Sequence, residues 1–235
     1  GIMSKGRVVI VTGAAGALGQ AVVSHFAELG DRVAVLDYSD DILKAAFPDT
    51  TENTLLVACD LTERASCSDA VSQVHSTWSR IDVLCNVAGG FMMGEAVHQT
   101  SDETWAALFD LNTRSIIHMA AEVVPLMQQQ GGGKVVNVSA KAALSGLANM
   151  GAYLASKSAV IRLTESMSQE LRHASINVNC ILPGTIDTPR NRTDMPDADH
   201  DKWVPPSDLA EVIGFLASDA ASAVHGASIP VEGLS

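Results

Sequence analysis

The chain has 235 residues, of which 47% are hydrophobic, and its formal net charge is −12. This length suits one α/β core, so we expect a single domain over residues 1–235. The acidic charge argues against nucleic acid and anionic membranes as partners, because both would repel it. We find no signal peptide, no apolar run of transmembrane length and no metal-ligand or disulfide spacing among the four cysteines, which predicts a cytoplasmic protein without a metal. Gly1-Ile2, before Met3, resembles an expression scar.

The first predicted strand, residues 7–12, is apolar and rich in β-branched side chains, and it runs directly into a glycine-rich turn and an amphipathic helix that ends at Gly30. Strand, glycine turn and helix form the context that a dinucleotide-binding fingerprint requires. Glycines let the backbone approach a pyrophosphate, and the helix N-terminus offers free N–H groups. A tight turn without a ligand is the alternative. The candidate phosphate-binding residues are Gly13, Ala15, Gly16, Ala17, Leu18 and Gly19.

The second predicted strand, residues 32–37, ends at Asp37, which lies 18 residues after Gly19. This is close to the spacing of about 20 residues at which an acidic side chain binds the adenosine ribose. A carboxylate there accepts hydrogen bonds from both ribose hydroxyls and repels a 2′-phosphate. Asp37 therefore predicts NAD(H) rather than NADP(H), with NADP(H) kept as a possibility. The alternative is that Asp37 caps a helix beginning at Asp40.

Strands and helices alternate through the rest of the chain. Further strands are expected at 53–59, 81–86, 134–139, 176–182 and 228–231, and further helices at 62–79, 101–127, 150–173 and 208–218. Thr100 with Glu103 is a predicted capping box for the helix at 101–127, and Ser207 is the predicted cap of the last helix. This order predicts a Rossmann-type α/β fold: a doubly wound, mostly parallel seven-stranded sheet with helices on both faces.

Ligands of such sheets bind at the carboxyl ends of the strands. Six residues of interest fall at these ends and should converge: Gly13, Asp37, Asp60, Ala88, Ser139 and Pro183. The polar and aperiodic stretch 186–205 follows another such end, which suits a substrate lid.

Tyr153 and Lys157 lie four residues apart in a predicted helix, so they share one helix face. A phenol has a pKa of about 10, which is too high for efficient acid/base work near neutrality. A neighbouring ammonium stabilises the phenolate and lowers that pKa. The alternative is a pair that faces solvent by chance.

Taken together, these motifs resemble the short-chain dehydrogenase/reductase family over essentially the whole chain. The resemblance implies hydride transfer between nicotinamide and a carbonyl or imine carbon, with Tyr153 as acid/base, Lys157 holding the nicotinamide ribose and Asn112 supporting a water-linked proton path. It implies a homodimer or homotetramer formed through the helices at 101–127 and 150–173. The implied cofactor contacts beyond the glycine turn and Asp37 are Asp60, Leu61, Asn86, Ala88, Gly89, Tyr153, Lys157, Pro183, Gly184, Ile186 and Thr188.

Three positions depart from the family pattern. Ala17 replaces the middle glycine of the loop, Val87 replaces the second asparagine of Asn-Asn-Ala-Gly, and Ala140 occupies the place of the serine that polarises the substrate oxygen. Ser139 is the expected substitute for that serine, with a purely structural hydroxyl as the alternative. Ser145 is a lesser candidate.

The segments 85–91, 140–146 and 182–203 resemble the quinonoid dihydropteridine reductase-like branch, whose imine substrate has no ketone oxygen to polarise. The expected substrate is therefore a small carbonyl, quinonoid or imine compound, such as a quinonoid dihydropterin. Phe91 and Trp203 are candidates for stacking on a flat heterocycle, with simple packing as the alternative. A catalytically weak nucleotide-binding regulator with the same fold is the rival hypothesis. Five histidines are expected at the surface or on a helix face: His98, His118, His173, His200 and His225. Cys59, Cys85 and Cys180 are expected in the core.

Overall fold

The structure is a computed structural model that describes residues 6–235, so the Gly1-Ile2 segment lies outside the described residues. Seven strands form one sheet in the order β3-β2-β1-β4-β5-β6-β7, and every neighbouring pair is parallel. The expected doubly wound sheet is confirmed. The strands are β1 (Val8–Thr12), β2 (Arg32–Asp37), β3 (Thr54–Ala58), β4 (Val83–Asn86), β5 (Gly133–Val138), β6 (Ile176–Pro183) and β7 (Ser228–Val231).

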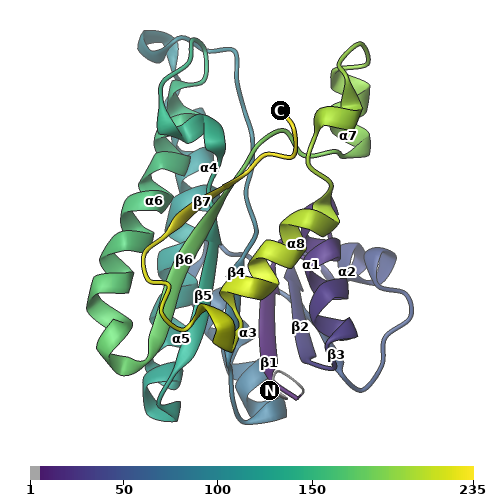
Figure 1. The fold of residues 1–235 in the computed structure, drawn as a ribbon, viewed down its shortest axis with the longest axis vertical. Coiled ribbons are helices and arrows are strands. Elements are labelled where there is room, and N and C mark those ends of the chain that lie inside the picture. The colour runs from purple at the N-terminus through teal and green to yellow at the C-terminus, as the bar shows by residue number, and fades with distance from the viewer. Residues whose placement is uncertain (1–5) are drawn as a thin grey trace.

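Helices cover both faces of this sheet (Figure 1). Side chains alternate along β1: Val8 and Ile10 belong to one apolar core, and Val9 and Val11 to the other. Residues of α3 and α5 complete the first core, and residues of α1 and α8 the second, which explains the continuous apolar runs in the strands. The helices are α1 (Ala17–Glu28), α2 (Asp40–Ala46), α3 (Arg64–Trp78), α4 (Asp102–Phe109), α5 (Ser115–Gln130), α6 (Gly151–Leu171), α7 (Pro189–Asp194) and α8 (Pro206–Leu216).

The helix expected at 101–127 is interrupted. A π-helical turn, Asp110–Arg114, separates α4 from α5, and Asn112 lies inside it. The expected capping box is wrong as well: the hydroxyl of Ser101 accepts from the backbone N–H of Thr104, whereas the hydroxyl of Thr100 donates to the carbonyl of Ala96.

The stretch 186–205 is more ordered than its sequence suggests. It contains α7, whose first turn is capped by the hydroxyl of Thr188, and a bridge that pairs Ile186 with Val204. Figure 1 shows α7 beyond the upper edge of the sheet, where the strands end. The predicted Ser207 cap is wrong, because α8 begins at Pro206, two residues before the expected start at Asp208, and has no side-chain cap.

All four cysteines are buried thiols, including Cys67, for which no burial was expected. His118 lies on a face of α5 and is buried, with Nδ1 2.8 Å from the carbonyl oxygen of Leu61. Among residues 6–235, none of the helices is both long and apolar enough to cross a membrane.

Candidate active site

A cavity of about 690 Å³ opens where β1, β2, β3 and β4 end, which is the position expected for a ligand of this fold. Twelve of the predicted cofactor contacts line it: Gly13, Gly16, Ala17, Leu18, Gly19, Asp37, Asp60, Leu61, Ala88, Gly89, Ile186 and Thr188. Seven further residues line the cavity and were not predicted from the sequence: Tyr38, Cys59, Thr62, Val87, Ala107, Asp110 and Leu111. Most of these flank a predicted residue, so proximity in sequence was the available signal.

The glycine turn needs two of its glycines for packing. A Cβ at Gly13, where φ is +60°, would lie 2.6 Å from Cα of Ala88, and a Cβ at Gly19 would lie 2.1 Å from the carbonyl oxygen of Gly13. Gly16 is different, since its nearest neighbour would be 3.5 Å away, and it caps α1 without a side chain. The first N–H groups of α1 therefore remain available at the cavity wall, which fits the binding of a pyrophosphate.

The Asp37 carboxylate lies at the cavity and is fixed by two backbone donors. Its Oδ2 accepts from the N–H of Ala15 at 3.0 Å, and its Oδ1 accepts from the N–H of Tyr38 at 2.8 Å. It does not cap α2, because the Ser39 hydroxyl does so. Ala15 itself does not line the cavity, and its amide acts by positioning Asp37.

Asp60 is held in a similar way at the end of the next strand. Its Oδ1 accepts from the N–H of Thr62 at 3.0 Å and from the Thr62 hydroxyl at 2.6 Å, while the Asp60 N–H donates to the Ser66 hydroxyl. These bonds fix the edge of the cavity formed by the β3–α3 connection.

Asn86 faces the core rather than the cavity. Its Nδ2 donates to Oδ1 of Asn137 at 2.9 Å, and Asn137 donates in turn to the Thr164 hydroxyl. The connection after β4 is held instead by the Thr12 hydroxyl, which accepts from the N–H groups of Val87 and Ala88, both at 3.1 Å. Asn86, a predicted cofactor contact, does not line the large cavity, and its side-chain amide is used inside the sheet.

Lys157 is 5% exposed, and its Nζ donates to the carbonyl oxygen of Val138 at 3.2 Å. Burial lowers the pKa of Lys157 to about 8. A Cβ placed on Gly89 would lie 2.9 Å from this Nζ, so the ammonium lies directly behind a glycine of the cavity wall. Glycine at position 89 thus leaves room for the lysine to approach a ligand in the cavity.

Tyr153 lies one helical turn before Lys157, with its ring 4.9 Å from that of Phe91 in an edge-to-face arrangement. Burial raises the pKa of Tyr153, the opposite of the lowering expected from the lysine charge. Its hydroxyl has no hydrogen-bond partner among residues 6–235. The phenol is therefore a proton-bearing group that remains available to a ligand.

Asn112 holds the backbone of Gly90. Its Oδ1 accepts from the Gly90 N–H at 2.7 Å, and its Nδ2 donates to the Gly90 carbonyl and to the Ser156 hydroxyl, both at 3.0 Å. The π-helical turn carries this buried amide toward both partners. The side chain thus positions the connection that covers Lys157.

Ser139 does not replace the missing serine. Its buried hydroxyl donates to the carbonyl oxygen of Lys157 at 2.6 Å, which is the structural alternative. Ser145 is exposed and lines neither cavity, and the buried Trp203 packs against the ring of His200. Pro183 and Gly184 also lie outside the lining of the large cavity.

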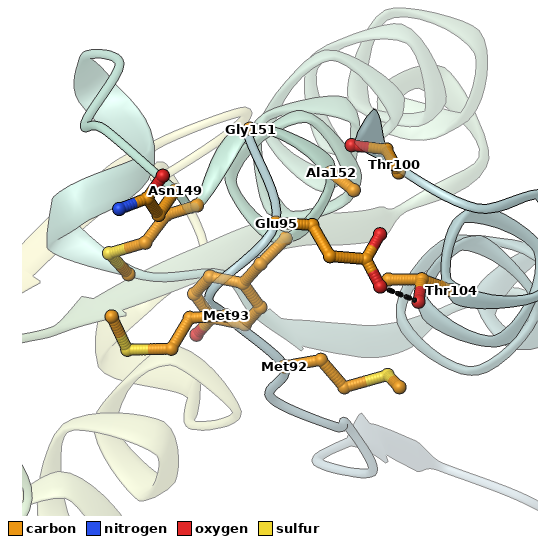
Figure 2. A pocket seen from close by; sticks show the side chains of 10 residues that line it. Met92, Met93, Glu95, Thr100, Thr104, Asn149, Gly151 and Ala152 are labelled. Atoms are coloured by element: carbon orange, nitrogen blue, oxygen red, sulfur yellow. Dashed lines mark hydrogen bonds between the residues drawn. The ribbon is translucent and has the colours of Figure 1, made fainter. Parts of the chain in front are cut away.

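A second, smaller pocket of about 100 Å³ lies beside Tyr153 (Figure 2). Its walls come from the connection between β4 and α4, the start of α4 and the start of α6. The lining residues are Met92, Met93, Glu95, Thr100, Thr104, Asn149, Met150, Gly151, Ala152 and Tyr153. Tyr153 therefore borders a space large enough for a small molecule.

Comparison with known proteins gives a consistent result. The family model described as short chain dehydrogenase matches residues 7–199. An NAD-dependent glycerol dehydrogenase of Listeria innocua is 31% identical, over 97% of this chain and 92% of its own. A 3-oxoacyl-[acyl-carrier-protein] reductase of Thermotoga maritima is 32% identical, over 97% of each chain. The structure of a 3-ketoacyl-(acyl-carrier-protein) reductase from Brucella melitensis complexed with NADH has a TM-score of 0.89 at 26% identity, covering 97% of this chain and 98% of that one.

Proposed function

The chain belongs to the short-chain dehydrogenase/reductase family, and from this premise we propose that it transfers a hydride between a nicotinamide cofactor and a small carbonyl, quinonoid or imine substrate. One observation carries the proposal. The free hydroxyl of Tyr153 borders the small pocket, and the buried ammonium of Lys157, one turn away, lies behind Gly89 in the wall of the large cavity. The proton donor and the ammonium that adjoins the large cavity therefore lie on the same helix, α6.

We assign the large cavity to the cofactor, which supplies the hydride when bound. The amides at the start of α1 would bind its pyrophosphate, and Asp60, Leu61 and Thr62 would border the adenine. Ile186 and Thr188 would contact the carboxamide, with Pro183 and Gly184 shaping the turn before them.

The proposed NADH preference rests on Asp37. Two backbone N–H groups fix its carboxylate at the cavity wall, so the charge cannot easily turn away from a ligand. A 2′-phosphate in the same place would meet like charge. Ribose hydroxyls would instead donate to it.

The residues of α6 perform the proton chemistry. Tyr153 would hold its proton until it passes it to the substrate oxygen or nitrogen, because burial raises the pKa of the phenol. Lys157 would donate hydrogen bonds to the nicotinamide ribose and stabilise the phenolate that remains. Asn112 would act as a positioning residue through Gly90 and Ser156.

The substrate class follows from what is missing near the phenol. Ala140 offers no hydroxyl, and Ser139 is engaged with the Lys157 carbonyl. A substrate that develops little oxyanion charge suits this site, since a missing oxyanion donor typically costs about 3–4 kcal/mol of transition-state stabilisation. A quinonoid dihydropterin is such an imine, and Phe91 offers an aromatic edge beside Tyr153.

We further propose that the chain forms a homodimer or homotetramer through the α4–α5 and α6 helices, and that 186–205 closes over the substrate. Trp105 on α4 and Ile117 on α5 support the first proposal, because they are 49% and 44% exposed. The position of α7 beyond the strand ends supports the second (Figure 1).

The test follows NADH oxidation with a quinonoid dihydropterin, with NADPH in parallel. We expect turnover with NADH and its loss in Tyr153→Phe, with NADH binding retained, because the phenylalanine lacks only the proton donor. Turnover of ketones but not of the pterin would remove the pterin alone. Tight NADH binding without turnover of any carbonyl, quinone or imine would favour the regulator.

A further inference from the structure

The connection formed by residues 90–95 is held at both ends. Gly90 is fixed by the Asn112 amide, and the N–H of Gly94 donates to the carbonyl oxygen of Asn149 at 2.9 Å. The segment between these two points cannot move far without breaking one of the bonds. It is therefore a fixed wall beside Tyr153.

Apolar side chains project from this segment. Phe91, Met92 and Met93 are 52%, 44% and 60% exposed, and the two methionines line the small pocket. Thioether side chains adapt to flat or irregular apolar surfaces. This part of the pocket is therefore suited to the carbon skeleton of a substrate.

Glu95 is the charged member of the pocket. Figure 2 shows its side chain reaching toward Thr104, with Met92 and Met93 below it in this view. Its Oε1 accepts from the Thr104 hydroxyl and its Oε2 from the Ser101 N–H, both at 2.8 Å. A carboxylate has about four acceptor sites, so each oxygen retains the capacity for a further hydrogen bond.

The charge of Glu95 has no counter-charge nearby. None of the ten lining residues is a Lys, Arg or His, and no ion pair to Glu95 is found within residues 6–235. Capping of α4 explains the two bonds that the carboxylate makes, but a neutral side chain could accept such bonds without placing a negative charge beside a catalytic phenol. The negative charge of Glu95 would attract donors and repel anionic groups of a molecule bound in the small pocket.

We infer that Glu95 is a specificity-determining residue that selects substrates whose non-reacting end carries N–H or O–H donors and no negative charge. The inference rests on the proposed function, because it treats the small pocket as the substrate site. It separates two kinds of substrate named among the relatives: a neutral polyol such as glycerol fits, whereas a substrate with an anionic group in this pocket does not. The aminopyrimidine edge of a pterin also meets this requirement, because it carries N–H donors and no negative charge.

Four small ketones of similar size provide the test: aminoacetone, hydroxyacetone, 2-butanone and acetoacetate. They differ at one end in charge and in hydrogen-bond donors. Their kcat/KM values with NADH, and their binding to the protein with NAD⁺ by saturation-transfer NMR, are compared in the wild type, in Glu95→Gln and in Glu103→Gln. Glu103 is an exposed carboxylate on the same helix end and does not line the pocket, so it controls for a general charge effect.

We expect aminoacetone to be preferred over acetoacetate by at least about tenfold in the wild type, as for a partly screened charge at close range. In Glu95→Gln the preference should fall at least about fivefold, and in Glu103→Gln it should stay within about twofold of the wild type. An unchanged ratio in Glu95→Gln, an equal change in Glu103→Gln, or no binding of either donor-bearing ketone would overturn the inference. Glu95-dependent binding of aminoacetone without turnover of any substrate would instead overturn the proposed function alone.

Discussion

Removing the Asn112 amide distinguishes two roles for this residue: support of a proton path, and positioning of Gly90. Asn112→Ala deletes both hydrogen bonds to the Gly90 backbone and the bond to the Ser156 hydroxyl, which keeps its bond to the Tyr153 carbonyl. Each lost bond is worth about 0.5–1.5 kcal/mol, with more where a buried group is left unsatisfied. The expected destabilisation is about 2–4 kcal/mol, which for a chain of this size lowers Tm by roughly 5–15 °C.

Thermal unfolding and steady-state kinetics together make the test. Thr113→Val is the matched control, because it removes one bond from the same π-helical turn, between the Thr113 hydroxyl and the Ser156 carbonyl, without touching Gly90. It should cost about 1 kcal/mol, a few degrees in Tm. An Asn112→Ala variant with an unchanged Tm and a strongly reduced kcat would refute the positioning argument and favour the proton path.

Three further predictions follow from the same geometry. Gly19→Ala should abolish NADH binding, because its Cβ would overlap the Gly13 carbonyl. Gly16→Ala should fold and lose at most about 1 kcal/mol of stability. Fluorescence titration with NADH and thermal unfolding compare the two variants. Burial lowers the pKa of Lys157 to about 8, so between pH 8 and 10.5 the unfolded chain binds more protons than the folded protein. The free energy of unfolding of the cofactor-free protein, measured by urea titration, should therefore rise with pH across this window. This rise should be lost in Lys157→Met. The reductive rate should hold to about pH 8 and then fall as Lys157 loses its charge; a reductive optimum above pH 9 would contradict this.

The sequence predicts the sheet well because each strand is a short apolar run buried on both faces, and each turn after it carries its own glycine or polar signal. The interruption of the helix expected at 101–127 is not predictable in this way. Its sequence is helical throughout, and the π-helical turn around Asn112 depends on partners at Gly90 and Ser156, 22 and 44 residues away. A tertiary contact decides the local conformation there.

The same limit explains why two predicted site side chains have hydrogen-bond partners within the protein. Ser139 lies one residue from the place where a serine would face the substrate, and successive side chains of an extended segment point to opposite sides, so its hydroxyl meets the Lys157 carbonyl instead. Asn86 follows the same rule: motif order places it beside the cavity, but its direction takes it into the chain of amides with Asn137. The position of a residue along its strand predicts whether it lies near the carboxyl-terminal edge of the sheet. Whether its side chain points toward the cavity depends on which of the two alternating directions it takes.

The electrostatics of α6 bear on the direction of the reaction. Burial without a counter-charge disfavours the ionised form of both groups, which is why the pKa of Tyr153 is raised and that of Lys157 is lowered to about 8. At neutral pH the phenol therefore keeps its proton and most of the lysine remains charged. A protonated phenol beside an ammonium is the state that reduction needs, because the substrate must receive a proton as it receives the hydride. Oxidation would start from the phenolate, which this environment disfavours until ligands supply hydrogen bonds, so the ligand-free site rests in the protonated state from which reduction would start.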